Sequence, residues 1–427
     1  MNFNELKTKL NNGDYNEQLK YIYASNDVDG YKNRFIEVMD GFLSTYNYEP
    51  DDMRLFSAPG RTEIGGNHTD HQHGCVLAAG LNLDVIAAVS LNEKNEVRIQ
   101  SKGYKMDVIS LDDLEPKKEE YDRASALIRG VIKKISDLGY EIKGFDAYTV
   151  SSVLKGSGMS SSAAFEVLVG TIINGLFCNN EINAIEIAKI AQYAENVYFG
   201  KPCGLMDQMA SSVGSIVAID FEDTNKPVVE KVEFDFTKSG HALCIIDSGA
   251  DHADLTDEYA GITIEMRMVA NYFGKDYLRE VNPLEFFDKL ADVRAAVKND
   301  RAILRAIHYF NDSQRAIDEV QALKDNDFER FLDIVKKSGQ SSYMYLQNIY
   351  AAKSPTQQAV SLVLALCDEI LGENGAYRVH GGGFAGTVQA FVPNEMVDEF
   401  KAKIEAVFGE GMCHILSIRP VGGTEIK

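Results

Sequence analysis

The sequence predicts a two-lobed protein that contains both strands and helices. Its 427 residues, 45% of them hydrophobic, are ample for a large core and for more than one domain. Apolar runs of strand type alternate with helical patterns in the first half, whereas helical periodicity dominates residues 258–371. A polar, charged connection at residues 222–238 separates these halves, and we place the lobe boundary there.

This division gives a helical extension at residues 1–50, a first lobe at 51–230 and a second lobe at 231–427. In the extension, apolar residues fall at helical spacing: Phe35, Val38, Met39, Phe42 and Leu43. We expect these helices to pack as an N-terminal cover.

The first lobe is expected to begin with strands. The pattern changes at Met53, a long apolar stretch rich in Val, Ile, Leu and Ala covers residues 76–91, and a third strand is predicted at 97–100. An acidic, lysine-rich link near 112–122 follows. The other elements predicted here are helices at 124–138 and 183–199, a strand-like run at 145–153, a helix from Ala163 and a strand at 215–220.

The second lobe is expected to combine many helices with a few strands. Strands are predicted at residues 242–247 and 413–419, a glycine-rich turn with a strand at 379–392, and a helix at 394–408. No internal repeat or low-complexity segment is visible.

Charge and composition exclude some classes of function. A net charge of −21 and a pI of about 4.8 argue against a nucleic-acid partner held by broad phosphate contacts, so any bound phosphate must be gripped locally. Six scattered cysteines without a C-x-x-C pair indicate free thiols in a reducing compartment. The first residues offer no apolar signal region, and no run approaches a membrane-spanning length. We therefore expect a cytoplasmic protein without a membrane partner; a monomer is compatible with the sequence, which does not determine the oligomeric state.

A glycine- and serine-rich stretch at residues 154–168, L-K-G-S-G-M-S-S-S-A-A-F-E-V-L, joins a strand-like run to an apolar helix. Glycines let the backbone approach a ligand, hydroxyls add donors, and a helix N-terminus favours negative charge. The stretch lacks the spacing of the Walker loop and of dinucleotide-binding loops. It predicts an anion cradle of a different design, and a turn that only caps a helix is the alternative.

A second motif, A-P-G-R-T-E-I-G-G-N-H-T-D-H-Q-H-G at residues 58–74, is a dense polar cluster beside apolar strands. Many rigidly held donors and acceptors suit a polyhydroxylated ligand such as a sugar. His68, Asp70, His71 and His73 also resemble the ligands of a metallohydrolase, although no second distant cluster completes a metal site. A plain surface loop is the third interpretation.

The motif C-G-L-M-D-Q at residues 203–208 places Asp207 among apolar and small residues. A carboxylate is costly there without a partner, and Arg61 is the obvious cation. A paired aspartate could orient and deprotonate a hydroxyl nucleophile, and Glu195 upstream could reach a magnesium ion on a nucleotide. A helix N-cap is the alternative role for Asp207. Cys203 is a weaker candidate nucleophile, because no histidine is near it in the sequence.

The motif R-V-H-G-G-G-F-A-G at residues 378–386 contains three adjacent glycines before a strand: Gly381, Gly382 and Gly383. Adjacent glycines indicate that another group lies close to the backbone here, either a ligand or a neighbouring loop.

These motifs resemble those of the galactokinases, within the larger GHMP family of small-molecule kinases that includes homoserine, mevalonate and phosphomevalonate kinases. The family's P-G-R-x-N-x-I-G-E-H-x-D-Y stands here as P-G-R-T-E-I-G-G-N-H-T-D-H, its G-L-S-S-S-A-A as G-M-S-S-S-A-A, and its C-G-I-M-D-Q as C-G-L-M-D-Q. The likeness runs from about Lys32 to the C-terminus. It implies a two-lobed α+β fold with a mixed sheet in the N-terminal lobe, helices plus an antiparallel sheet in the C-terminal lobe, and an active site between them.

The resemblance also implies ATP-dependent phosphorylation of a sugar at its anomeric hydroxyl, with Mg²⁺. Asp207 would orient or deprotonate that hydroxyl, and Arg61 would hold the carboxylate ionised. The residues implied to contact the sugar are Asn67, His68, Asp70, Gly204, Asp207 and Tyr259. Those implied to wrap the phosphates are Gly156, Ser157, Gly158, Met159, Ser160, Ser161 and Ser162. Ser162 or Ser161, together with Glu195, would bind magnesium.

Three residues depart from the family pattern at the sugar end: Asn67 stands in place of Glu, His71 in place of Tyr and Glu63 in place of Asn. Galactose, converted to galactose 1-phosphate, is the expected substrate. An amide at Asn67 that accepts a hydrogen bond from the exocyclic hydroxyl would broaden tolerance there. The alternatives are a kinase for a sugar altered at C6 or C2 (a uronic acid, a 6-deoxy sugar or N-acetylgalactosamine) and a non-catalytic sugar sensor, against which the intact S-S-S-A-A run argues.

Overall fold

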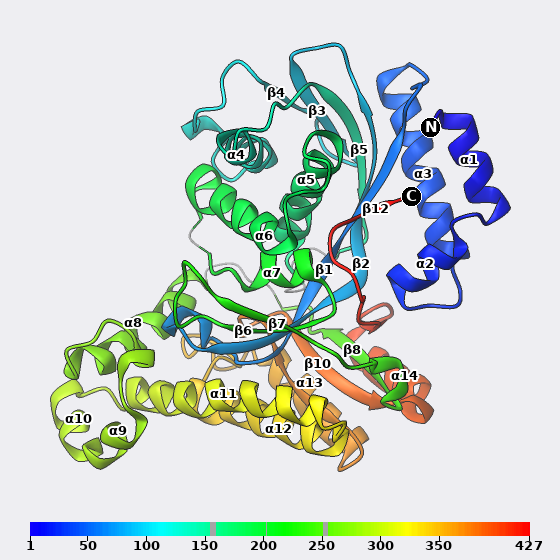
Figure 1. Ribbon diagram of the computed structural model, residues 1–427. Coiled ribbons are helices and arrows are strands. Elements are labelled where there is room, and N and C mark those ends of the chain that lie inside the picture. The colour runs from blue at the N-terminus through cyan, green and yellow to red at the C-terminus, as the bar shows by residue number, and fades with distance from the viewer. Residues whose placement is uncertain (154–158, 202, 251–254) are drawn as a thin grey trace.

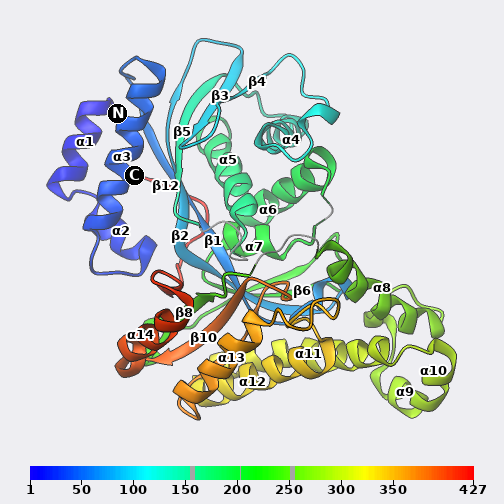
Figure 2. The ribbon, with the colours of Figure 1, turned by 180° about the vertical axis from the view of Figure 1, so that it is seen from behind.

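The computed structural model describes residues 1–153, 159–201, 203–250 and 255–427 (Figure 1). Within these residues the strands form two sheets, a larger mixed sheet and a smaller antiparallel one. Both views show the larger sheet and its helices above the smaller sheet and the long helices of the second half (Figures 1 and 2). The α+β class and the two-lobed arrangement expected from the sequence are confirmed.

The larger sheet has the strand order β12-β1-β2-β5-β3-β4 among the described residues, with β6 paired to β2 and β7 paired to β6. Only β3 and β5 run parallel there. The long strand β2 pairs with β6 through its first half and with β5 through its second half. The bounds are β1 Arg54–Gly65, β2 Cys75–Leu91, β3 Glu96–Ser101, β4 Asp107–Ser110, β5 Phe145–Ser151, β6 Ile216–Asp220, β7 Val228–Val232 and β12 Thr424–Ile426.

Helices cover both faces of this sheet. One face carries α1 (Phe3–Asn12), α2 (Asn16–Tyr23) and α3 (Asp29–Tyr46), drawn in blue in Figure 1, so the expected N-terminal cover is confirmed. The other face carries α4 (Ala124–Asp137), α5 (Ser161–Phe177), α6 (Ala184–Tyr193) and α7 (Met206–Val213). Because both faces are covered, β1 and β2 are buried along most of their length and do not alternate.

The smaller sheet has the order β11-β8-β10-β9 and is antiparallel throughout the described residues. Helices pack against it and extend beyond it as a projecting group, α8 to α10 (Figure 2). The strands are β8 His241–Asp247, β9 Ala376–His380, β10 Thr387–Pro393 and β11 Cys413–Leu416. The helices are α8 Thr256–Tyr272, α9 Pro283–Asp288, α10 Leu290–Val297, α11 Asp300–Lys324, α12 Phe328–Ser341, α13 Ala359–Leu371 and α14 Val397–Phe408.

Four short strands were missed by the sequence analysis: β4, β7, β9 and β12. Each has three to five residues, too few for a clear alternation, and β7 is mostly exposed. Strand β7 lies inside the polar connection at 222–238 and pairs with β6, while β12 returns the chain end to β1. The larger sheet therefore draws on both halves of the chain. The domain limits at residues 50 and 230 stay predictions.

The helix predicted at 183–199 is two elements. Helix α6 ends at Tyr193, and the chain continues as a π-helical turn over Ala194–Phe199. A second π-helical turn, Ser342–Leu346, follows α12. Such turns often occur at functional sites, and the first one carries Glu195.

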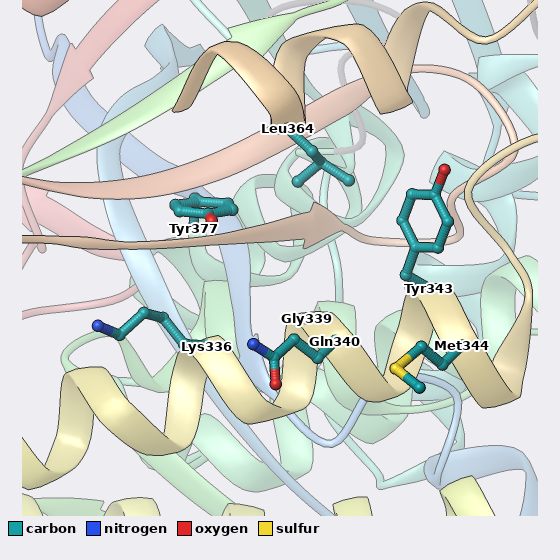
Figure 3. A pocket seen from close by; sticks show the side chains of 7 residues that line it. All are labelled: Lys336, Gly339, Gln340, Tyr343, Met344, Leu364 and Tyr377. Carbon is teal, nitrogen blue, oxygen red and sulfur yellow. The ribbon is translucent and has the colours of Figure 1, made fainter. Parts of the chain in front are cut away.

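A hollow of about 210 Å³ lies outside the region between the lobes. Its walls come from α12, the π-helical turn after it, α13 and β9. Figure 3 shows the residues that line it: Lys336, Gly339, Gln340, Tyr343, Met344, Leu364 and Tyr377. It contains none of the residues that the sequence motifs single out as ligand contacts.

Candidate active site

The predicted pair of Asp207 and Arg61 forms. Arg61 lies on β1 between two shifts of register in its pairing with β2, and Asp207 is in the first turn of α7. The Nε of Arg61 donates to Oδ1 of Asp207 at 2.7 Å. The arginine side chain is 8% exposed and the aspartate 31%, so the carboxylate keeps an open side. Irregular pairing of β1 lets it aim this arginine at the start of α7.

The electrostatics of the pair keep Asp207 ionised. Burial alone would raise the pKa of its carboxyl. The charge of Arg61 and hydrogen bonds from Arg61 and Ser160 outweigh burial and hold that pKa below its ordinary value. The pKa of Arg61 is correspondingly raised, because Asp207 more than offsets the effect of its burial. Asp207 is therefore a carboxylate at neutral pH.

The described end of the anion cradle lies against this pair. The carbonyl of Met159 accepts a bond from the Arg61 amide at 3.2 Å, and Ser160 is the residue before α5, with a positive φ of 52°. Ser161 and Ser162 begin that helix. Gly156, Ser157 and Gly158 lie outside the described residues. The N-terminus of α5, which has free N–H groups, therefore lies close to the Asp207 carboxylate.

A buried group of oxygen atoms surrounds Gln208. Its Nε2 donates to Oε2 of Glu195 at 2.7 Å and to Oε2 of Glu166 at 3.3 Å. Both glutamates are buried, and the pKa of Glu166 is raised well above its ordinary value by burial and by the charge of Glu195. The sequence analysis missed Glu166 and Gln208. The signal was present, since a charged residue interrupts the apolar pattern of α5.

The residues present fit a magnesium ion. Ser162 precedes Glu166 by four residues on α5, so both lie on one face of the helix that meets Glu195 through Gln208. The Oε1 of Glu166 is buried with no hydrogen-bond partner in the described part of the chain. A hydroxyl and a carboxylate are the oxygen donors that magnesium prefers. No set of three or more His, Cys, Asp or Glu side chains in the described residues is arranged to hold a metal by itself, so the ion would need further oxygens from a nucleotide and water.

On the other side of the pair lie His68, Asp70 and Gly204. A Cβ on Gly204 would lie 2.7 Å from Oδ2 of Asp70, so the loop before α7 touches that carboxylate. His68 has a positive φ of 59°, and its Nε2 is 2.9 Å from the carbonyl of Gly382. Burial and the neighbouring His71 hold the pKa of His68 below its ordinary value. A neutral imidazole and a carboxylate thus stand beside Asp207, a set of polar groups that suits a sugar.

The three glycines of the third motif are packed against side chains of the protein. The carbonyl of Gly381 accepts from Asn67 at 2.8 Å and that of Gly383 from the Tyr259 hydroxyl at 3.0 Å. A Cβ on Gly382 would lie 2.6 Å from the ring of Tyr259. Of the two interpretations left open by the sequence, a close neighbour in the protein accounts for this turn.

Asn67 differs from the expectation that its amide faces the sugar. The side chain is fully buried. Its Nδ2 donates to Oε1 of Glu63 and to the Gly381 carbonyl, both at 2.8 Å, and its Oδ1 accepts from Asn348 at 2.8 Å and Ser342 at 3.2 Å. All four hydrogen-bonding positions of the amide are used within the protein. The predicted hydrogen bond to an exocyclic hydroxyl therefore has no free atom at Asn67.

The metallohydrolase interpretation is not supported by the arrangement of the histidines. His73 stacks on Tyr277 with ring centroids 3.7 Å apart, whereas His68 points to Gly382. His71 lies 3.7 Å from Asp70, but no group of three or more His, Cys, Asp or Glu in the described part of the chain could hold a metal ion.

Searching the described residues for a helix with the length and apolarity needed to cross a bilayer finds none.

Comparison with known proteins decides the family. Residues 126–215 match the GHMP kinases N terminal domain, and residues 40–91 match the galactokinase galactose-binding signature. The chain is 32% identical over 357 residues to the galactokinase of Glaesserella parasuis serovar 5 (strain SH0165), covering 81% of this chain and 87% of the relative. The chain belongs to the galactokinase family. A second member, the galactokinase of Actinobacillus pleuropneumoniae serotype 3 (strain JL03), is 30% identical over 370 residues, 84% of this chain and 90% of the relative.

Solved structures of kinases have a similar fold. The structure of Lactococcus lactis galactokinase complexed with galactose superposes with a TM-score of 0.77 at 23% identity, covering 92% of this chain and 99% of that one. Methanococcus jannaschii mevalonate kinase gives a TM-score of 0.62 at 15% identity, covering 86% and 99%. The fold is therefore shared over most of the chain.

Proposed function

We propose that this galactokinase-family protein is an ATP-dependent sugar 1-kinase that converts galactose to galactose 1-phosphate. The observation that carries the proposal is the Asp207–Arg61 pair, which lies between the end of the anion cradle at Ser160 and the His68–Asp70 group. A hydroxyl bound beside Asp207 would face a phosphate held at the N-terminus of α5. A cytoplasmic location is part of the same proposal.

In this mechanism Asp207 orients the anomeric hydroxyl and accepts its proton. The hydroxyl oxygen bonds to the γ-phosphorus of ATP as the bond from that phosphorus to the bridging oxygen breaks, and ADP leaves. Arg61 keeps Asp207 ionised and stabilises negative charge on the transferring group. Phosphoryl transfer needs mainly positioning and neutralisation of charge, so one oriented carboxylate, one arginine and a cradle of N–H groups are a sufficient set of protein groups.

Residues 156–162 would wrap the phosphates, with Ser160, Ser161 and Ser162 as hydroxyl donors. Ser162 and Glu195 would hold a magnesium ion, which when bound would neutralise charge on the phosphates. Gln208 fixes the orientation of the Glu195 carboxylate through its 2.7 Å bond. This role explains why an amide follows Asp207 in the chain.

The sugar would lie against His68, Asp70, Gly204 and Tyr259. A second substrate class is favoured by one observation: Asn67 and Glu63 both direct their polar atoms into the protein. A sugar altered at C6 or C2, such as a 6-deoxy sugar, a uronic acid or N-acetylgalactosamine, would meet no charged group from these two residues.

The test is a sugar panel with ATP and magnesium in which ADP formation is measured. Galactose, glucose, 6-deoxygalactose, galacturonic acid and N-acetylgalactosamine are compared, with Asp207→Asn as the inactive control. We expect galactose to give the largest kcat/KM. A larger value for a C6- or C2-modified sugar assigns the second class, and no ADP release with any sugar would overturn the proposal.

A further inference from the structure

A lysine next to the candidate metal ligand Glu195 has no role in the mechanism above. Lys201 follows the π-helical turn, and the amides of Gly200 and Lys201 both donate to the Glu195 carbonyl. Gly200 has a φ of 85°, and a Cβ there would lie 3.0 Å from the ring of Tyr121. The backbone of Lys201 is therefore fixed at a tight corner while its side chain extends from that corner.

The ammonium of Lys201 faces the outward oxygen of Glu195. Its Nζ is 3.7 Å from Oε1 of Glu195, whereas Oε2 of the same carboxylate is held by Gln208. The positive charge also lowers the pKa of Asp207 and opposes the rise at Glu166. Lys201 thus acts electrostatically on all three carboxylates of the site.

This ion pair is poorly suited to stabilising the fold. The lysine side chain is 64% exposed and the distance exceeds that of a hydrogen bond, so the pair contributes little to stability. A lysine on a four-carbon stem can turn to another partner without moving the backbone. Arg61 cannot do so, because it is buried and bonded to Asp207.

The net charge of the protein makes a local cation important. A chain of charge −21 repels a nucleotide polyphosphate, and part of that charge, the carboxylates of Asp207 and Glu195, lies in the site itself. Charges placed beside a binding site control the local concentration of an ionic ligand.

We propose that Lys201 binds the phosphates of the nucleotide: it pairs with Glu195 when the site is empty and turns its ammonium to a phosphate oxygen when the nucleotide binds. This inference rests on the proposed function, since it takes ATP as the phosphate donor. Lys201 then favours binding of the nucleotide even before a metal ion is present, because its charge substitutes for part of the metal's.

The test measures ADP binding by isothermal titration calorimetry in excess EDTA, which removes metal from the comparison. Lys201→Met should weaken ADP binding about tenfold, the loss expected for one charge-assisted contact to phosphate, and Lys201→Arg should retain it within about threefold. The matched control is Lys403→Met, which removes the same charge from an exposed pair with Glu399 on α14. That control should bind ADP as the wild type does.

Steady-state kinetics provide the second measurement. Lys201→Met should raise the KM for ATP about tenfold and change the KM for galactose less than about twofold. Lys201→Gln with the same thermal midpoint as the wild type serves as the second variant if the methionine variant folds poorly. Unchanged ADP binding in both neutral variants, or an equal loss of ADP binding in Lys403→Met, would overturn the inference. The proposed function would still stand in that case, provided that the wild type turns over galactose. Absence of wild-type turnover would instead overturn the proposed function.

Discussion

Asn67→Glu should destabilise the fold strongly, and adding Glu63→Asn to the same chain should restore much of the loss. The two residues are in direct contact, with Nδ2 of Asn67 donating to Oε1 of Glu63 at 2.8 Å, and both are buried. A carboxylate at position 67 cannot donate, so it would confront the oxygens of Glu63 and of the Gly381 carbonyl with a third acceptor. In the double variant the amide at position 63 can donate to the carboxylate at position 67, so the pair again has one donor and one acceptor.

The magnitude follows from these contacts. Losing two donated bonds to buried acceptors, with two carboxylates about 3 Å apart, should cost about 3–5 kcal/mol of unfolding free energy. Glu63→Asn alone should cost about 3 kcal/mol, because Arg378 is fully buried and donates to Glu63 at 2.8 Å. In the double variant a carboxylate again lies near Arg378, so the coupling between the substitutions should be at least about 2 kcal/mol.

The assay is equilibrium unfolding in urea for the wild type, both single variants and the double variant, at pH 7 and pH 5. The loss in Asn67→Glu should shrink at pH 5, because two adjacent buried carboxylates raise the pKa of the pair and protonation in acid relieves the repulsion. The matched control is Asn95→Glu, an exposed asparagine that donates to Asp112 at 2.7 Å. It should cost less than about 1 kcal/mol. Additive single effects, or an Asn67→Glu protein as stable as the control, would refute the reasoning.

Three further predictions concern the site itself. Asp207→Asn should lower turnover on the order of 10²-fold or more with the far-ultraviolet circular dichroism unchanged, and near-normal ADP release would rule out its role. Because the folded-state pKa of Asp207 is lowered, its stabilisation is present above the ordinary value of about 4 and is lost as the pH falls through the folded-state value. The stability difference between wild type and Asp207→Asn should thus hold from pH 7 to 5 and shrink below about pH 4; growth of that difference in acid, seen by urea unfolding, would contradict the assignment. Gly204→Ala should raise the KM for the sugar about tenfold and leave that for ATP within about twofold, because its Cβ would displace the Asp70 carboxylate, whereas Gly30→Ala, with open space around it, should leave both constants unchanged.

The sequence was sufficient where the physical signal is local. The apolar pattern after three serines predicts α5, and a carboxylate among apolar residues calls for a cation, which the structure supplies as Arg61 at 2.7 Å from Asp207. The long apolar run at 76–91 likewise predicts β2, because a strand covered on both faces needs apolar residues throughout.

Other features depend on contacts that no local pattern contains. Strand β12 has three residues, and its pairing with β1 is fixed by tertiary packing. In the sequence Gln208 is an ordinary polar helix residue. Its role depends on Glu166 and Glu195, which α5 and the π-helical turn place beside it. The left-handed conformation of Ser160 also gives no sequence signal, since serine rarely adopts it.

Two of the departures from the family pattern in the second motif, Glu63 and Asn67, belong to one connected network and are not independent changes. Glu63 accepts from Arg378, the side chain of Asn67 donates to Glu63, and the backbone N–H of Asn67 donates to Asp312 at 2.9 Å. Gly65 stands where the family pattern has Ile, and a Cβ there would lie 1.8 Å from Oε2 of the buried Glu319.

All of the partners outside the motif come from the second half of the chain, so the altered residues serve the junction between the lobes. The motif alone predicts a changed sugar contact at Asn67. The structure assigns the change to the protein's own interior, and substrate preference must therefore be sought at His68, Asp70, Gly204 and Tyr259, whose polar atoms or backbone lie beside Asp207 or the third glycine turn.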